Sequence, residues 1–131
     1  MALKRDIDVL FDNTTTQRRL ALVRGFEAAN RGGSGLRGAL VLLSQSPYRV
    51  ARYFATEEGG TSTRARRAQA VWLHLGETNE EAWNVLVRRN ESIATTLRCL
   101  GYETSRDLMQ HGFVLAMCNL HVVMGYPLLP I

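Results

Sequence analysis

Lysine is almost missing from this chain, because Lys4 is the single lysine and the other fifteen basic residues among 131 are arginines. Cysteine and proline are also scarce, at two and three residues, and no apolar run is long enough to cross a bilayer. Two distant cysteines exclude a disulfide-built scaffold and predict reduced, buried thiols. Since no apolar leader follows Met1, we expect a soluble, cytoplasmic protein without a membrane partner.

Motifs for catalysis and for cofactor binding are missing as well. Neither G-x-x-x-x-G-K-[ST] nor G-x-S-x-G occurs, and the adjacent glutamates at 57–58 and 80–81 fall at loop or helix-start positions. His111, Cys118 and His121 share one face of a predicted helix, but no fourth metal ligand accompanies them and packing explains them better. The sequence therefore predicts a protein that is not an enzyme and holds no metal or cofactor.

The spacing of apolar residues predicts an all-α protein. Apolar side chains recur with helical periodicity between Gly, Pro and Ser/Thr boundaries, and no segment alternates as a strand does. We expect a compact bundle of about six helices in a single domain over residues 1–131. The expected helices span residues 2–11, 16–30, 36–44, 48–55, 63–75, 78–100 and 104–125, the first of which need not be independent. The last is apolar nearly all round from Gly112 to Met124, which predicts a buried central helix.

The final six residues are strongly apolar and cannot continue a helix because Pro127 and Pro130 interrupt them. Such a terminus either packs on its own core or docks on a neighbouring subunit. In the second case the contacts to an oligomer or a protein partner are made by Tyr126, Leu128, Leu129 and Ile131.

The segment from Leu36 to Phe54 reads LRGALVLLSQSPYRVARYF. Ser46 is a good N-cap, and the proline that follows it suits the first position of a short helix rich in Arg and Tyr. Two short helices joined by a polar turn resemble a helix-turn-helix DNA-binding unit. In that family the second helix enters the major groove, so the resemblance implies DNA contacts from Tyr48, Arg49 and Arg52. An ordinary pair of bundle helices is the alternative.

Three arginines, Arg64, Arg66 and Arg67, occupy the first turn of the helix expected after Ser62 or Thr63. The positive end of the helix dipole disfavours cations there by a few tenths of a kcal/mol each, so an outside anion is indicated. The Gly/Ser/Thr loop before them offers backbone and hydroxyl donors for a phosphate. A solvated helix start without a ligand is the alternative.

The net charge of +4 is unevenly distributed along the chain. Residues 1–75 hold twelve Arg or Lys against six Asp or Glu, whereas residues 76–131 hold four against six. This asymmetry favours an anionic partner. We therefore predict a helical protein that binds DNA or RNA through its Arg-rich N-terminal half. The alternative is an interaction or assembly protein, such as a viral or phage-type structural subunit or inhibitor within the host cell, that forms a homo-oligomer through its tail.

Overall fold

Contacts along the chain divide it into two units, Met1–Leu40 and Val41–Ile131. The computed structural model describes residues 2–93 and 99–131, with the side chains from residue 15 onward. These residues form five α-helices and two short 3₁₀ helices, and none of them is in a strand. The all-α prediction is confirmed, with five helices in place of about six. A single domain over residues 1–131 stays a prediction.

The first unit is built on one long helix, α1 (Ala2–Asn30). Two helices, 2–11 and 16–30, were expected to be separated by the capping residues Asn13 to Thr16, and that division is wrong. Asn and Thr cost less than about 0.7 kcal/mol each in a helix interior, whereas a second helix needs a second, costly nucleus. The chain therefore continues as a helix through these residues.

The helix expected over residues 36–44 does not form, and this segment has no regular structure. Gly38 instead uses its backbone on the end of α1: its carbonyl accepts from Asn30 Nδ2 at 2.7 Å and its N–H donates to Asn30 Oδ1 at 3.3 Å. A Cβ at Gly38 would come within 3.0 Å of the Phe26 ring, so a larger residue here would need that ring to shift by a few tenths of an ångström. A nine-residue segment interrupted by glycine has too few backbone bonds to form a stable helix alone.

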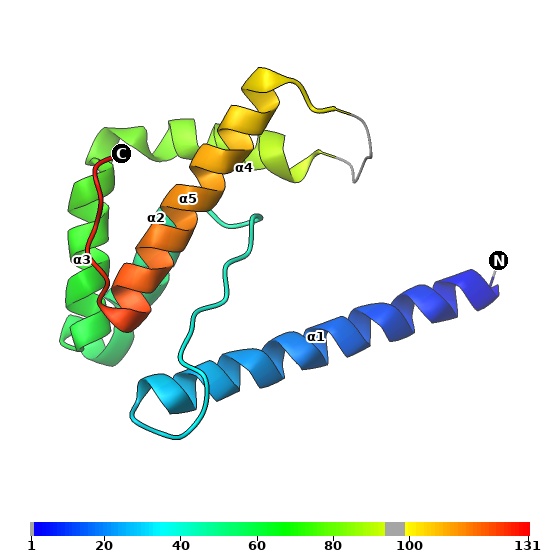
Figure 1. Ribbon diagram of the computed structural model, residues 1–131, viewed down its shortest axis with the longest axis horizontal. Coiled ribbons are helices and arrows are strands. Elements are labelled where there is room, and N and C mark those ends of the chain that lie inside the picture. Colours follow the sequence, from blue (N-terminus) through cyan, green and yellow to red (C-terminus); the bar gives the residue numbers. More distant parts are fainter. Residues whose placement is uncertain (1, 94–98) are drawn as a thin grey trace. The chain divides into compact units, whose positions relative to one another are not determined.

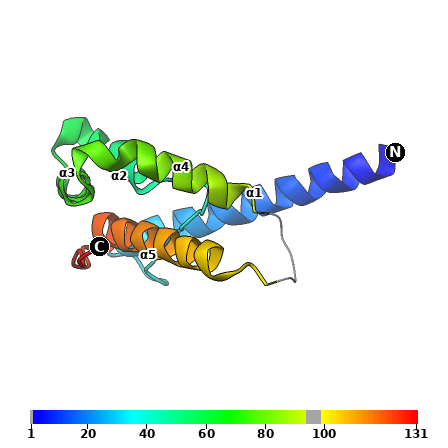
Figure 2. The same cartoon turned by 90° about the horizontal axis from the view of Figure 1, so that it is seen from above.

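The second unit contains α2 (Pro47–Ala55), α3 (Thr63–Leu75), α4 (Glu80–Glu91) and α5 (Tyr102–Met124). The 3₁₀ helices η1 (Glu57–Gly60) and η2 (Glu77–Asn79) connect α2 to α3 and α3 to α4. Helices α2 and α3 pack on each other and on α5, and α4 also packs on α5 (Figure 1). Seen from above, α2, α3 and α4 form one layer of this unit, and α5 lies with the C-terminal tail in the other (Figure 2).

Helix starts follow the sequence closely. Ser46 caps α2 by accepting from Arg49 N at 3.1 Å, with Pro47 at the first position, and Ser62 caps α3 by accepting from Ala65 N at 3.0 Å. The expected helix 78–100 is shorter than predicted, because α4 ends at Glu91 and residues 94–98 lie outside the described residues. The Ser92 hydroxyl donates to the Arg89 carbonyl at 2.7 Å, a local bond that competes with helix continuation.

The core of the second unit lies between α5 and the α2–α3 pair. Its fully buried members come from all three helices and include Tyr48, Ala51, Ala68, Val71, Val114, Cys118 and Val122. The prediction that α5 is a buried central helix holds for this face alone, since Phe113 on the opposite face is exposed. Burial raises the pKa of the Cys118 thiol to about 12, whereas Cys99 is exposed, which corrects the expectation of two buried thiols.

A buried polar chain joins α4 and α5 to the loop before α2. His111 is fully buried; its Nε2–H donates to the Gln45 carbonyl at 2.9 Å, and its Nδ1 accepts from Asn90 Nδ2 at 3.2 Å. The carbonyl can only accept, so these bonds determine the neutral tautomer of the ring. Asp107, also buried, accepts from Arg106 at 3.0 Å and from Arg89. Each polar side chain of this buried network thus has a hydrogen-bond partner, as burial requires.

Tyr48 connects α2 to the end of α3. The side chain is 0% exposed, its ring meets Trp72 edge-to-face at 5.2 Å, and its hydroxyl donates to the carbonyls of Leu75, at 3.0 Å, and Gly76. Burial raises the pKa of this hydroxyl, which keeps it protonated and able to donate.

We expect Tyr48→Phe to lower the free energy of unfolding by about 0.5–1.5 kcal/mol, because the buried hydrogen bonds from its hydroxyl to the carbonyls of Leu75 and Gly76 are lost. Urea unfolding measures the loss. Tyr53→Phe is the matched control, since Tyr53 lies on the same helix but is 76% exposed, and it should change stability little. Equal effects at the two positions would contradict the role given to the buried hydroxyl.

Candidate nucleic-acid interface

The solvent face of α2 is formed by Arg49, Arg52 and Tyr53, all exposed. Successive helical residues are rotated by about 100°, which places these three side chains on one side of the helix. The opposite side is buried, with Pro47, Tyr48, Val50 and Ala51 facing the core. Two guanidinium groups and one phenol therefore share an outward surface, which we call the α2 face.

The implied contact from Tyr48 is wrong, because that side chain is inside the protein. The tyrosine on the α2 face is Tyr53, which the sequence analysis did not predict as a contact residue. The signal was present: Tyr53 is four residues from Arg49, one helical turn, whereas Tyr48 is rotated by about 100° from it. The helix-turn-helix resemblance also fails at its first helix, since residues 36–44 are not helical.

The two arginines of the α2 face differ in their surroundings. Arg52 donates to Glu80 Oε1 at 2.7 Å and lies over the Trp72 ring, with 5.5 Å from its Cζ to the ring centroid. Arg49 forms no ion pair with any acidic residue that the structure describes. Arg49 is therefore available to an external anion, and Arg52 is available once its exposed pair with Glu80 exchanges.

The anion at the start of α3 comes from the chain itself. Glu57 accepts from Arg64 Nε at 2.9 Å, from a second Arg64 nitrogen, and from the Ser62 hydroxyl at 3.0 Å. Arg64 also covers the Phe54 ring, with its Cζ 5.5 Å from the centroid. The carboxylate thus sits beside the positive end of α3, where a bound phosphate was expected. An internal ion pair explains the placement of Arg64 without a ligand.

The other two arginines of this turn point elsewhere. Arg67 donates to the Val122 carbonyl at 3.4 Å, at the negative end of α5, and a Cβ on Gly125 would come within 2.6 Å of it. Arg66 is exposed and forms no ion pair with the described residues. Arg66 is rotated by about 160° from Arg64 along the helix, and Arg64 and Arg67, although only about 60° apart, have different partners in Glu57 and the Val122 carbonyl.

The first unit carries a further set of exposed arginines that sequence reasoning did not single out. All five arginines between residues 15 and 40 are exposed, and Glu27 is the one acidic residue of that range. They are Arg18, Arg19, Arg24, Arg31 and Arg37. The density of arginine in the sequence was the available signal.

Comparisons with protein-family models, curated proteins and solved structures give no match.

The apolar tail packs on its own unit. Leu128 lies against the core, the Leu129 N–H donates to Met117 Sδ at 3.1 Å, and the Leu129 carbonyl accepts from His74 Nε2 at 2.9 Å. Tyr126, Leu129 and Ile131 nevertheless remain about half exposed. Of the two outcomes expected for the tail, packing on its own core is observed, and docking on a neighbour stays a prediction.

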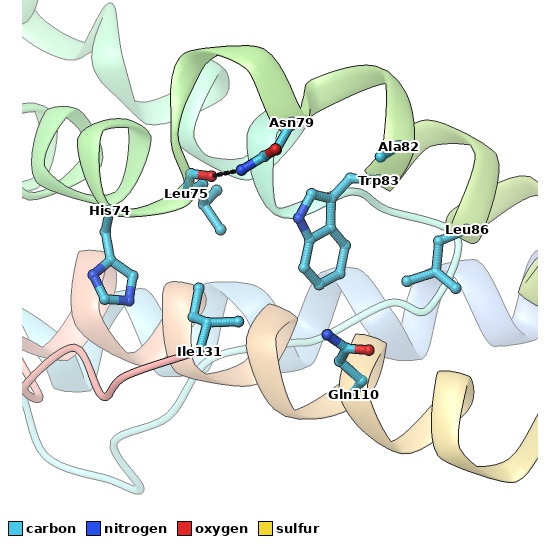
Figure 3. Close-up of a pocket in the computed structure, with 8 residues that line it drawn as sticks. All are labelled: His74, Leu75, Asn79, Ala82, Trp83, Leu86, Gln110 and Ile131. Carbon is cyan, nitrogen blue, oxygen red and sulfur yellow. Dashed lines mark hydrogen bonds between the residues drawn. The ribbon is translucent and has the colours of Figure 1, made fainter. Parts of the chain in front are cut away.

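A groove of about 450 Å³ lies between α4, α5 and the end of the tail (Figure 3). The Trp83 side chain points from α4 toward α5 beside Gln110, and Asn79 Nδ2 donates to the Leu75 carbonyl at 2.9 Å (Figure 3). Its lining residues include no carboxylate, serine or cysteine.

Among the residues that the structure describes, no group of three or more His, Cys, Asp or Glu lies together as metal ligands would. No described helix combines the length and apolar character needed to cross a membrane.

We expect Glu57→Ala to lower the free energy of unfolding by about 1–2 kcal/mol, because Arg64 and Ser62 lose a charged acceptor. Inorganic phosphate should then stabilise the variant more than the wild type, by replacing the missing carboxylate. Thermal unfolding with and without phosphate measures both effects.

Glu81→Ala is the control, since it removes an exposed pair with Arg88 worth less than about 0.5 kcal/mol. Losses of equal size in the two variants would show that Glu57 has no special part at the start of α3.

Proposed function

We propose that this chain binds nucleic acid through the exposed arginines of its N-terminal half, by contact with the phosphate backbone. One observation carries the proposal: between residues 15 and 55 all seven arginines are exposed, and Glu27 is the one acidic residue among them. They are Arg18, Arg19, Arg24, Arg31, Arg37, Arg49 and Arg52. Such a density of one charge attracts a polyanion and releases its counterions on binding.

Arginine is well suited to this task. The guanidinium group binds phosphate through two parallel N–H donors and keeps its charge at any physiological pH. Tyr53, beside Arg49 and Arg52 on the α2 face, adds an exposed ring on which an unpaired base can stack. This combination supports binding that follows the backbone and depends little on base sequence.

The proposal assigns different parts to the arginines at the start of α3. Arg64 is neutralised by Glu57, and Arg67 lies at the carbonyl end of α5, so both have partners within the protein. Arg66 is exposed and adds one more positive charge that is available to the polyanion.

We expect Arg49→Ala to weaken binding and to lower the slope of log K against log salt by about 0.9 for duplex DNA, as one phosphate contact is lost. Fluorescence anisotropy over a series of salt concentrations, on duplex and single-stranded probes, measures this. Arg18→Ala with Arg19→Ala should lower the duplex slope by about twice that amount.

Arg88→Ala is the matched control, because Arg88 is also exposed on a helix but pairs with Glu81 outside the arginine-rich half. It should leave the slope unchanged. The proposal fails if micromolar wild-type protein binds neither probe at low salt, or if Arg49→Ala and Arg88→Ala have the same effect.

Assembly is a second candidate function, and a specific observation favours it. Tyr126, Leu129 and Ile131 stay about half exposed at the end of α5, beside further apolar side chains of that helix. None of these three residues is among the seven arginines proposed to contact nucleic acid.

A further inference from the structure

Helix α5 has two apolar faces. The buried face includes His111, Val114, Cys118 and Val122, and packs into the core. The opposite face contains Tyr102, Met109, Phe113, Ala116 and Leu120, which lie within about 40° of one line along the helix at 100° per residue. Tyr102, Met109 and Phe113 are 80%, 75% and 51% exposed. We call these five residues the outer stripe of α5.

The outer stripe is raised at one end and hollow at the other. At its N-terminal end Tyr102 and Met109 project into solvent. At its C-terminal end a groove of about 270 Å³ is lined by apolar side chains: Phe113, Ala116, Met117, Leu120, Tyr126, Pro127 and Leu129. Polar residues normally cover such a surface in a monomer, and an exposed apolar surface of this extent is typical of a protein interface.

The spacing of the stripe makes it complementary to itself. Eighteen residues, five full turns or about 27 Å, separate Tyr102 from Leu120. In an antiparallel pair of α5 helices centred at residue 111, Tyr102 of one copy lies level with Leu120 of the other, and Met109 lies level with Phe113. The projecting tyrosine of each copy therefore reaches the groove of its partner.

We infer that α5 pairs antiparallel with α5 of a second copy of this chain, forming a twofold dimer in which Tyr102 occupies the partner's groove. Such an interface is isologous, with the same surface on both subunits. At about 200 Å² for each large side chain, the stripe and the exposed tail residues offer on the order of 600 Å² per copy. Standard stable interfaces use about 800 Å² per partner, so the surface has the size that a dimer needs once its rim is included.

Charge does not oppose this pairing. Arg106 lies at the edge of the stripe, level with Ala116 of the second copy, and already pairs with Asp107 of its own chain. Antiparallel helices also place the positive end of one dipole beside the negative end of the other. The inference is independent of the proposed nucleic-acid binding, because none of the stripe or groove residues is among the seven exposed arginines between residues 15 and 55.

The test measures the mass of the full-length protein by light scattering at micromolar concentration, after nuclease treatment and in high salt. We expect twice the 14.7 kDa of one chain. Met109→Lys and Phe113→Glu should each yield monomers, with a dissociation constant raised roughly 100-fold, because each change acts at two symmetric contacts worth about tenfold or more each. Leu73→Lys, at an exposed leucine on α3, is the control and should remain dimeric.

Mixing the two variants tests the register. In the heterodimer Lys at 109 lies level with Glu at 113 of the other chain, and the second contact is native, so the mixture should recover the dimer mass. A monomeric wild type, or a dimer unaffected by Met109→Lys, overturns the inference. Failure of the mixture to dimerise overturns the antiparallel register. Circular dichroism confirms that each variant is folded.

Discussion

The burial of Tyr48 between α2 and α3 decides which side of α2 meets solvent. With this ring against Trp72 and its hydroxyl on the carbonyls at the end of α3, rotation of α2 would remove a satisfied donor from the core. This orientation of α2 leaves Arg49, Arg52 and Tyr53 on its solvent side. The same contact holds the end of α3 in place, from which η2 and α4 continue.

Internal partners determine which arginines are left for other molecules. Glu57 neutralises Arg64, Asp107 holds Arg89 and Arg106, and the carbonyl end of α5 receives Arg67. These contacts stabilise helix termini and join helices, so part of the positive charge in the sequence serves the fold. The seven exposed arginines between residues 15 and 55 are outside that set, apart from the exposed pair of Arg52 with Glu80, and the proposed function rests on them.

The two faces of α5 have different roles in the structure. One face supplies the centre of the second unit, and the outer stripe leaves Tyr102 and Met109 largely exposed. A helix that is apolar all round is expected to be buried all round, and a second copy of the chain provides the missing cover in the proposed dimer.

Local chemistry in the sequence determined the helical class and most helix starts. Ser46 with Pro47, and Ser62, act as caps because their side chains satisfy backbone donors within three residues, a property that needs no tertiary contact. Glycines at 76 and 125 end their helices with positive φ, which glycine adopts without strain because it has no Cβ, and this too is a local property. The sequence also showed that arginine is concentrated in the first half.

Only the tertiary structure decided where those residues point and with what they pair. Tyr48 and Tyr53 are tyrosines of the same short helix. The packing of α2 on α3 and α5 buries Tyr48 and leaves Tyr53 exposed. The Arg64 partner is seven residues away, across η1, where Glu58 at φ 52° and Gly59 at φ 65° turn the chain. The loss of the helix at 36–44 depends on Gly38 meeting Asn30 and Phe26. These outcomes are set by packing between segments; helical spacing groups Tyr53 with Arg49, but which side of the helix faces inward depends on the segments packed against it.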